Sequence, residues 1–176
     1  QNGLGVMHAE GRGVTQDETE AVRWHRLAAE QGYATAQLAL GVMYERGRGV
    51  TQDEAEALRW YRLAADQGST GTMLGIRRIA EQGNAEAQLA LGKIYFSGQG
   101  VAEDATEGVR WWRLAAEQGY LPAQTGLGGR YLDGRGVAQD EAEAVRWYLL
   151  AAEQEHLAAQ VTLGSMYAEG LGVAAD

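Results

Sequence analysis

Apolar residues recur at helical spacing in two successive stripes between residues 33 and 68. The first stripe consists of Ala36, Ala39, Leu40, Met43 and Tyr44. The second stripe consists of Ala57, Trp60, Tyr61, Ala64 and Ala65. Spacings of three and four residues place each set on one face of an α-helix. Because a glycine-containing stretch separates the stripes, the pattern predicts two helices packed as an antiparallel hairpin.

The hairpin belongs to a 36-residue unit that recurs along the chain. Full copies occupy residues 33–68, 84–119 and 120–155. Partial copies occupy residues 1–32 and 156–176, and a shortened unit occupies residues 69–83. A fixed period of this length is typical of a repeat array, in which each unit contacts mainly its neighbours. We therefore predict an all-α fold in which residues 1–176 form a single array of helix hairpins.

Glycines and aspartates mark where the helices of each unit stop and start. Gly47 and Gly49 follow the first helix, where glycine permits a left-handed backbone. Asp53 is a predicted N-cap of the second helix, and Glu56 stands three residues later, as in a capping box. The glycine loop recurs at Gly11-Gly13-Val14, Gly98-Gly100-Val101, Gly134-Gly136-Val137 and Gly170-Gly172-Val173. The cap recurs at Asp17, Asp104, Asp140 and Asp176, and the tryptophan of the second helix recurs at Trp24, Trp111 and Trp147.

These spaced features together resemble the Sel-one-like repeat (SLR) family. They are Leu-Gly-x-x-Tyr, Gly-x-Gly-Val-x-x-Asp, Ala-x-x-Trp and Ala-Ala-x-x-Gly. They return in the full copies, except that Gly108 replaces the alanine before Trp111 and Glu155 replaces the closing glycine. The family is related to the tetratricopeptide repeat but has a longer loop between its helices. The resemblance covers nearly the whole chain and implies a right-handed α/α superhelical solenoid. It also implies a role in protein–protein interaction, as an adaptor or scaffold, in bacterial signalling and envelope proteins or in eukaryotic ER quality control.

Residues 69–83 break the period, because the glycine loop, the capping aspartate and the tryptophan of a full unit are missing there. Two interpretations stay open. A single helix replaces the hairpin, or a segment of the repeat is absent from the sequence. A separation between Met73 and Arg78 too long for one helical turn would favour the second interpretation. Both chain ends also cut through a unit without a polar cap, which favours a fragment of a longer array or ends covered by a partner.

The charge balance and composition limit the classes of partner. The formal net charge is −9, and an acidic chain is a poor partner for nucleic acid or for an anionic membrane surface. No run of apolar residues is long enough to insert into a membrane. The chain contains no cysteine, so it has neither disulfides nor a thiolate site. The compartment stays open, since the bacterial periplasm, secretion and the cytoplasm are all compatible with this composition.

Residues of the types that catalyse reactions or bind metals have structural explanations in this chain. His8, His25 and His156 each replace an aromatic residue of the repeat and lie in different units, whereas metal ligands and catalytic groups must converge on one point. The Asp-Glu-x-Glu sequences at residues 53–56 and 140–143 are explained by helix capping. We therefore predict no catalytic residues, no metal site and no cofactor. Trp112 is the one tryptophan outside the repeated core position, and so the one with a claim to a surface role.

The predicted binding site is the second face of the first helices. In tetratricopeptide-like arrays this face is concave and binds peptides, and the resemblance implies the same here. The predicted peptide-binding residues are Thr35, Leu38, Val42, Glu45, Glu86, Leu89, Lys93 and Phe96. Their counterparts in later units are Pro122, Thr125, Gly129, Leu132, Ala158, Val161, Ser165 and Ala168. An exposed apolar stripe of this kind often marks an interaction site, although packing of adjacent units would bury the same residues.

The favoured function is a non-enzymatic scaffold whose concave face holds a segment of a protein partner. Leu38, Leu89 and Phe96 would form apolar pockets, while Lys93 and Glu45 would set the orientation of the segment. Self-association through the uncapped ends is the first alternative. A hydrolase acting on cell-wall-type small molecules is a further alternative, and it rests only on distant family precedent.

Overall fold

The computed structural model describes residues 1–172, which form ten α-helices and no strand. Its contacts divide the chain into two compact units, Gln1–Ile79 and Ala80–Asp176, hereafter unit 1 and unit 2. Unit 1 contains α1 (Asn2–Glu10), α2 (Glu18–Ala29), α3 (Ala34–Arg46), α4 (Glu54–Ala65) and most of α5 (Thr72–Glu81). Unit 2 contains α6 (Ala85–Ser97), α7 (Ala105–Glu117), α8 (Leu121–Asp133), α9 (Glu141–Ala152) and α10 (Leu157–Glu169).

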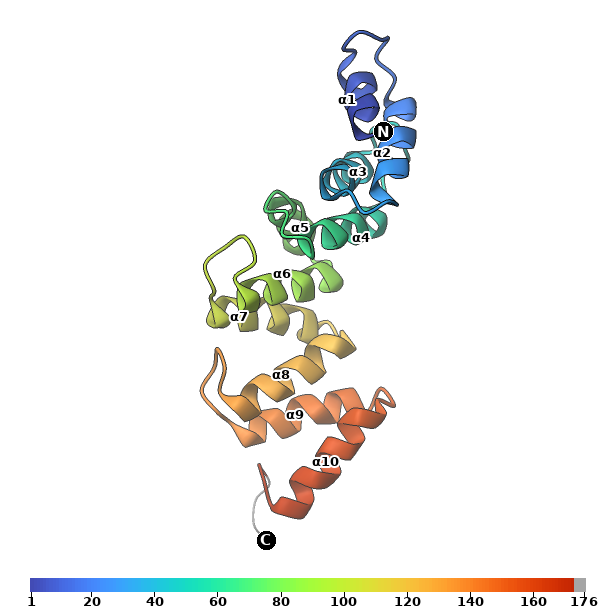
Figure 1. Ribbon diagram of the computed structural model, residues 1–176. Helices are drawn as coiled ribbons and strands as arrows, with labels where there is room; N and C mark the ends of the chain where they lie inside the picture. The colour runs from blue at the N-terminus through green and yellow to red at the C-terminus, as the bar shows by residue number, and fades with distance from the viewer. Residues whose placement is uncertain (173–176) are drawn as a thin grey trace. The chain divides into compact units, whose positions relative to one another are not determined.

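Helices that follow one another in the sequence pack against each other, from α1 to α4 in unit 1 and from α6 to α10 in unit 2 (Figure 1). The predicted apolar stripes form the contacts. Ala36, Leu40, Ala57, Tyr61 and Ala64 are fully buried. Alanines and glycines on the stripes let the paired helices approach closely: a Cβ at Gly41 of α3 would lie 2.6 Å from the Tyr61 ring of α4. The all-α repeat fold of helix hairpins is thereby confirmed.

The predicted helix ends are also confirmed. Gly47 follows the last residue of α3 and has a left-handed φ of 64°. Asp53 caps α4 by accepting a hydrogen bond from the Glu56 amide at 3.0 Å. Equivalent caps occur at Asp17, Asp104 and Asp140. Gly49, the second glycine of the loop after α3, lies against the backbone of the preceding hairpin. A Cβ at this position would be 2.2 Å from the Glu18 carbonyl oxygen. Val173 and Asp176, predicted as the last loop and cap, lie outside the described residues.

A repeated pair of glutamines, which the sequence reasoning did not single out, joins neighbouring hairpins. Gln37 is buried in α3, where its Nε2 donates to the Ala29 carbonyl at 3.1 Å and its Oε1 accepts from Gln67 at 2.8 Å. The buried amide therefore links the last turn of the preceding hairpin to the end of the hairpin that contains it. The same pairing recurs in unit 2 as Gln88 with Gln118 and Gln124 with Gln154, each at 2.7 Å.

The shortened repeat at residues 69–83 forms one helix in place of a hairpin. Met73 and Arg78 both lie within α5, which is continuous from Thr72 to Glu81, so the structure has the single-helix arrangement of the two that the sequence left open. Ile76 and Ile79 of α5 are fully buried. Gly75 provides room for the preceding hairpin, because a Cβ there would lie 2.3 Å from the Tyr61 ring.

Candidate functional site

The predicted peptide-binding residues on α3 are largely engaged within unit 1. Thr35 is exposed and accepts a hydrogen bond from Asn2 at 3.2 Å. Leu38 and Val42 are half-buried, and Leu38 packs against Gly71. Glu45 accepts hydrogen bonds from the Tyr61 hydroxyl and from Arg78, both at 2.6 Å, and its side chain is 13% exposed. The Glu45 carboxylate is therefore already hydrogen-bonded to other side chains of unit 1.

The predicted residues on α6 fall into two groups. Leu89, expected on the surface as an apolar contact for a peptide, is 7% exposed and belongs to the core of unit 2. It lies in the same buried cluster as Val109 of α7 and Leu127 of α8, and the Trp112 indole of α7 donates to its carbonyl at 3.0 Å. Glu86 and Lys93 are exposed, and Phe96 is half-buried.

The equivalents of the predicted peptide-binding residues in the later repeats, on α8 and α10, differ from one another in exposure. On α8, Pro122 is exposed and the others are half-buried, namely Thr125, Gly129 and Leu132. On α10, all four are exposed, namely Ala158, Val161, Ser165 and Ala168.

Lys93 and Phe96 line a pocket of about 540 Å³ in unit 2, hereafter the α6–α8 pocket. Its lining residues come from α6, α7, α8 and the two loops that follow α6 and α8. They are Lys93, Phe96, Ser97, Glu103, Trp112, Arg130 and Arg135. Three further aromatic or cationic residues join the two predicted on α6. They are Arg130, Arg135 and Trp112, the tryptophan that stands outside the repeated core position.

Two aromatic rings form the apolar part of this pocket. The ring centroids of Phe96 and Trp112 are 4.6 Å apart, at an interplanar angle of 60°, an edge-to-face arrangement that aromatic pairs favour. The Trp112 Nε1 donor is already used by the Leu89 carbonyl, so what the indole offers a ligand is apolar surface. The indole needs small neighbours, because a Cβ at Gly126 of α8 would lie 2.7 Å from its ring.

Gly108 provides the corresponding space for Phe96. Other hairpins have alanine at this place, namely Ala21, Ala57 and Ala144, and each of these is fully buried. A Cβ at Gly108 would lie 3.0 Å from the Phe96 ring and 3.0 Å from the Gly92 carbonyl oxygen. Glycine lowers the helix propensity of α7 at this place, and in return it accommodates the larger ring.

Arg130 supplies charge from a position that is apolar in the other hairpins. Its equivalents Met43, Ile94 and Met166 are buried. The Arg130 guanidinium lies 5.5 Å from the Phe96 ring centroid and pairs with Asp133 at 2.9 Å. Its Nε is buried and has no hydrogen-bond partner among the described residues. An arginine at a core position with an unsatisfied donor is costly for folding, so its presence favours a role other than stability.

Arg135 and Lys93 add two further cations. Arg135 donates to the Phe96 carbonyl at 3.0 Å and pairs with Glu103 at 2.7 Å. Lys93 is exposed and forms no ion pair with another residue in the described part of the chain. Three cationic side chains and one carboxylate thus line the α6–α8 pocket, in a chain whose formal net charge is −9.

The other candidate groups have structural roles. His25 is 3% exposed, its Nδ1 lies 3.0 Å from the Asn2 Oδ1, and burial lowers its pKa. The His156 side chain caps α10 by accepting from the Ala159 amide at 3.2 Å. Within residues 1–172, no group of three or more His, Cys, Asp or Glu side chains could hold a metal ion. None of the helices in the same range is long and apolar enough to cross a membrane.

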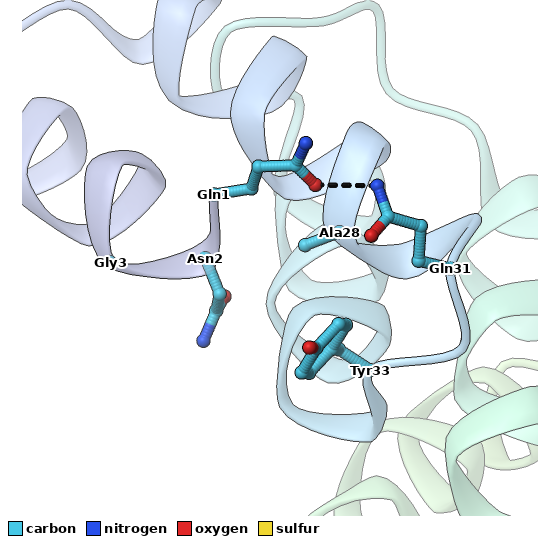
Figure 2. A pocket seen from close by; sticks show the side chains of 6 residues that line it. All are labelled: Gln1, Asn2, Gly3, Ala28, Gln31 and Tyr33. Atoms are coloured by element: carbon cyan, nitrogen blue, oxygen red, sulfur yellow. Dashed lines mark hydrogen bonds between the residues drawn. The ribbon is translucent and has the colours of Figure 1, made fainter.

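Unit 1 contains two further pockets. The pocket in Figure 2 measures about 340 Å³ and lies beside Gln1, Ala28, Gln31 and Tyr33. The dashed line in Figure 2 marks the hydrogen bond from Gln31 to Gln1, 2.7 Å long, so the glutamine amides there bind each other. A second pocket of about 400 Å³ lies along α2 and the loop after α3. Its Arg23 already pairs with Glu20 at 3.3 Å.

The family model of the Sel1 repeat matches residues 1–33, 34–69, 85–120, 121–156 and 157–176. The chain belongs to the Sel1 repeat family. Two matched segments, 85–120 and 121–156, contain the whole α6–α8 pocket. The pocket therefore lies within regular Sel1 repeats, and side-chain substitutions at repeat positions build it.

Two solved Sel1 repeat structures are similar to this chain over nearly its whole length. One is a protective antigen present in uropathogenic Escherichia coli strains, with 37% identity and a TM-score of 0.52 over 99% of this chain and 34% of that one. The other is a Sel1 repeat protein from Oxalobacter formigenes, with 34% identity and a TM-score of 0.52 over 99% of this chain and 66% of that one. This chain thus spans about a third of the first relative and just under two thirds of the second. No curated protein matches the sequence.

Proposed function

We propose that this Sel1 repeat protein is a non-enzymatic scaffold that binds a segment of a protein partner in the α6–α8 pocket. The proposal rests chiefly on one observation: three positions that are structural in other hairpins carry Phe96, Trp112 and Arg130 here, and together they line the pocket. Aromatic and arginine side chains are enriched at the energetic centres of protein interfaces. The adaptor role implied by the family resemblance agrees with this assignment.

The proposed site keeps part of the predicted peptide-binding face and adds to it. Lys93 and Phe96 belong to both, and exposed Glu86 extends the site along α6. Trp112 and Arg130 are the additions from α7 and α8. The role of Thr35, Leu38, Val42 and Glu45 on α3 stays a prediction, and Leu89 acts beneath the site as a core residue.

Affinity capture with a matched control tests this function. The native protein, the double variant Lys93→Ala/Phe96→Ala and the control Arg46→Ala would be immobilised and exposed to extract from the source cell. Circular dichroism must first show that all three remain folded. We expect a partner that the native protein and the control both retain and that the double variant loses. Equal recovery by all three proteins would contradict binding in the α6–α8 pocket, and turnover of a cell-wall-type substrate would instead support a hydrolase.

Self-association is a second candidate, because α10, the last helix that the structure describes, exposes apolar residues whose equivalents in other helices are more buried. Leu157 and Val161 are 76% and 71% exposed, whereas Leu89, the equivalent of Val161 on α6, is 7% exposed. Tyr167 is 47% exposed, against 8% for its equivalent Tyr131. A second copy packing on this face would cover it. Light scattering tests the idea: association should weaken in Val161→Glu, and a monomer at high concentration would exclude it.

A further inference from the structure

We infer that the α6–α8 pocket selects a segment in which an acidic side chain stands beside an apolar one. This inference rests on the proposed scaffold function and adds the chemistry of the partner. The apolar side chain would lie on the Phe96 and Trp112 rings, and the carboxylate would pair with the cations at the rim of the pocket.

The charge of the pocket favours an anionic group. Arg130 and Arg135 approach the Phe96 ring to 5.5 and 5.8 Å, so their positive charges lie at the apolar surface itself. Each arginine has one carboxylate partner within unit 2, while Lys93 has none among the described residues. A ligand carboxylate can pair with Lys93 without displacing an existing ion pair. A basic ligand would instead meet three like charges, which is unfavourable at an interface.

The shape of the pocket favours an apolar group in the same ligand. Phe96 and Trp112 are held edge to face, and the indole nitrogen already has its acceptor. The part of these half-buried rings that faces the pocket would be stabilised by contact with an apolar side chain. The rings and the cations line one pocket of about 540 Å³, so the two ligand groups must be close together in the partner.

The source of the carboxylate is an internal Asp or Glu side chain. Capture of a chain terminus commonly uses a nest of backbone N–H groups. The cations of this pocket are side chains from α6, α8 and the loop after α8. Lys93, which has no ion pair within residues 1–172, is a flexible point charge that can meet a carboxylate from several directions.

Binding of short blocked peptides tests the inference. The probe is a fluorescent Gly/Ser peptide, acetylated and amidated, that carries one Glu-Phe pair. Its matched relatives carry Gln-Phe, Glu-Ala or Lys-Phe, and a fourth carries Gln-Phe with a free C-terminal carboxylate. The intact native chain, Lys93→Glu and the control Arg46→Gln would be titrated with each peptide by fluorescence anisotropy.

We expect the native chain to prefer Glu-Phe over Gln-Phe by about tenfold, with the preference shrinking as salt is added. Glu-Ala should bind more weakly than Glu-Phe, because it leaves the rings uncovered. Lys93→Glu should lose the preference for Glu-Phe and gain a preference for Lys-Phe. Arg46→Gln, which removes a surface cation outside the pocket, should behave as the native chain does.

Lys93 is the only lysine of the chain, which allows the site to be mapped chemically. A carbodiimide joins a carboxylate to a nearby amine through an amide bond. We expect the Glu-Phe peptide to couple to Lys93, as located by peptide mapping. The variant Lys93→Arg keeps the charge and should still bind the peptide, but it should not couple to it.

The remaining outcomes separate failure of this inference from failure of the proposed function. Equal binding of Glu-Phe and Gln-Phe, lost in Phe96→Ala, would retain the scaffold and overturn the acidic preference. Stronger binding of the peptide with the free C-terminus would overturn the internal source of the carboxylate. Absence of peptide binding would overturn the inference, and if affinity capture also failed to depend on the pocket, the proposed function would fall with it.

Discussion

Equivalent positions of the α3–α4 hairpin in unit 1 and the α6–α7 hairpin in unit 2 carry side chains with different roles. In unit 1, α3 contributes Glu45, α4 contributes Tyr61, and the next helix, α5, contributes Arg78, and the three side chains bind one another. In unit 2, the places of Glu45 and Tyr61 contain Phe96 of α6 and Trp112 of α7, and these two rings line a pocket together with Arg130 of α8, which stands one residue beyond the equivalent of Arg78.

The difference lies mainly in the residue of the first helix. Glu45 gives the neighbouring cation and hydroxyl an acceptor, and burial together with this hydrogen bond raises the pKa of Tyr61. Phe96 offers no acceptor, so Arg130 lies over a ring and relies on Asp133 of its own helix. One repeat backbone can therefore hold either a closed polar network or an open aromatic and cationic pocket, and a few side chains decide between them.

The largest effect is expected from opening the closed network. Glu45→Ala should lower the free energy of unfolding by about 3 kcal/mol, because it leaves the buried Tyr61 hydroxyl and Arg78 without their acceptor. Denaturant unfolding measures the loss. The exposed Glu30 serves as a control, since Glu30→Ala should change stability by less than about 0.5 kcal/mol. A similarly small loss for Glu45→Ala would show that the network does not stabilise unit 1.

Two glycine-to-alanine substitutions in unit 2 should have opposite signs. Gly164→Ala has free space around its new Cβ and should stabilise α10 by about 1 kcal/mol through helix propensity. Gly108→Ala should destabilise the protein by about 1–2 kcal/mol, because the methyl group crowds the Phe96 ring and a backbone carbonyl. Adding Phe96→Leu should recover part of that loss. If Gly108→Ala proved as stabilising as Gly164→Ala, Gly108 would not be the space that the larger ring requires.

Replacing Arg130 by methionine, a residue found at this place in other repeats, should make the protein more stable and weaken its binding of the peptide. Arg130→Met should raise the free energy of unfolding by about 1 kcal/mol, since it removes a buried unsatisfied donor and restores an apolar core residue. The same variant should bind the Glu-Phe peptide more weakly. Thermal unfolding and anisotropy report the two effects. A variant that lost stability would show that Arg130 serves mainly to hold unit 2 together.

The smallest effect concerns the first repeat, where His25 occupies the place of Tyr61 and Trp112. Burial lowers the pKa of His25 below its ordinary value of 6.5, so the unfolded chain binds a proton more readily than the folded one. Stability should therefore fall as the pH drops below about 6.5 and level off once it is below the folded pKa. His25→Phe should flatten this slope in melting curves recorded from neutral to mildly acidic pH. An unchanged slope would show that other titratable groups cause the pH dependence of stability.

The repeat period accounts for most of the fold, and a single repeat cannot account for the site. Helix positions, loop glycines and aspartate caps each follow from local rules, so they were predictable from the sequence. The burial of Leu89 was not, because it depends on the cluster that this side chain forms with residues of α7 and α8. An apolar residue beside the main stripe looks the same in the sequence whether or not the next helix covers it.

Other parts of the site left a signal that only comparison between repeats reveals. Gly108, Trp112 and Arg130 each depart from the residue that other copies carry at the same place. Taken singly, they are a glycine within a helix, an extra aromatic residue and a cation at a place that is apolar in other repeats. Their contacts in three dimensions show that they compensate for one another, and contacts of that kind are not encoded in periodicity. The glutamine pairs also recur at the repeat period, and polar residues that recur within an apolar stripe are a signal of buried hydrogen bonding.

Heteronuclear NMR of the nitrogen-15-labelled protein tests the central claim most directly. The chain has five tryptophans, so five indole N–H signals report on five places at once. On titration with the Glu-Phe peptide, the Trp112 signal should shift in proportion to occupancy, while those of Trp24, Trp60, Trp111 and Trp147 stay fixed. Shifts that spared Trp112, or that spread equally over all five indoles, would contradict the assignment of the α6–α8 pocket as the binding site.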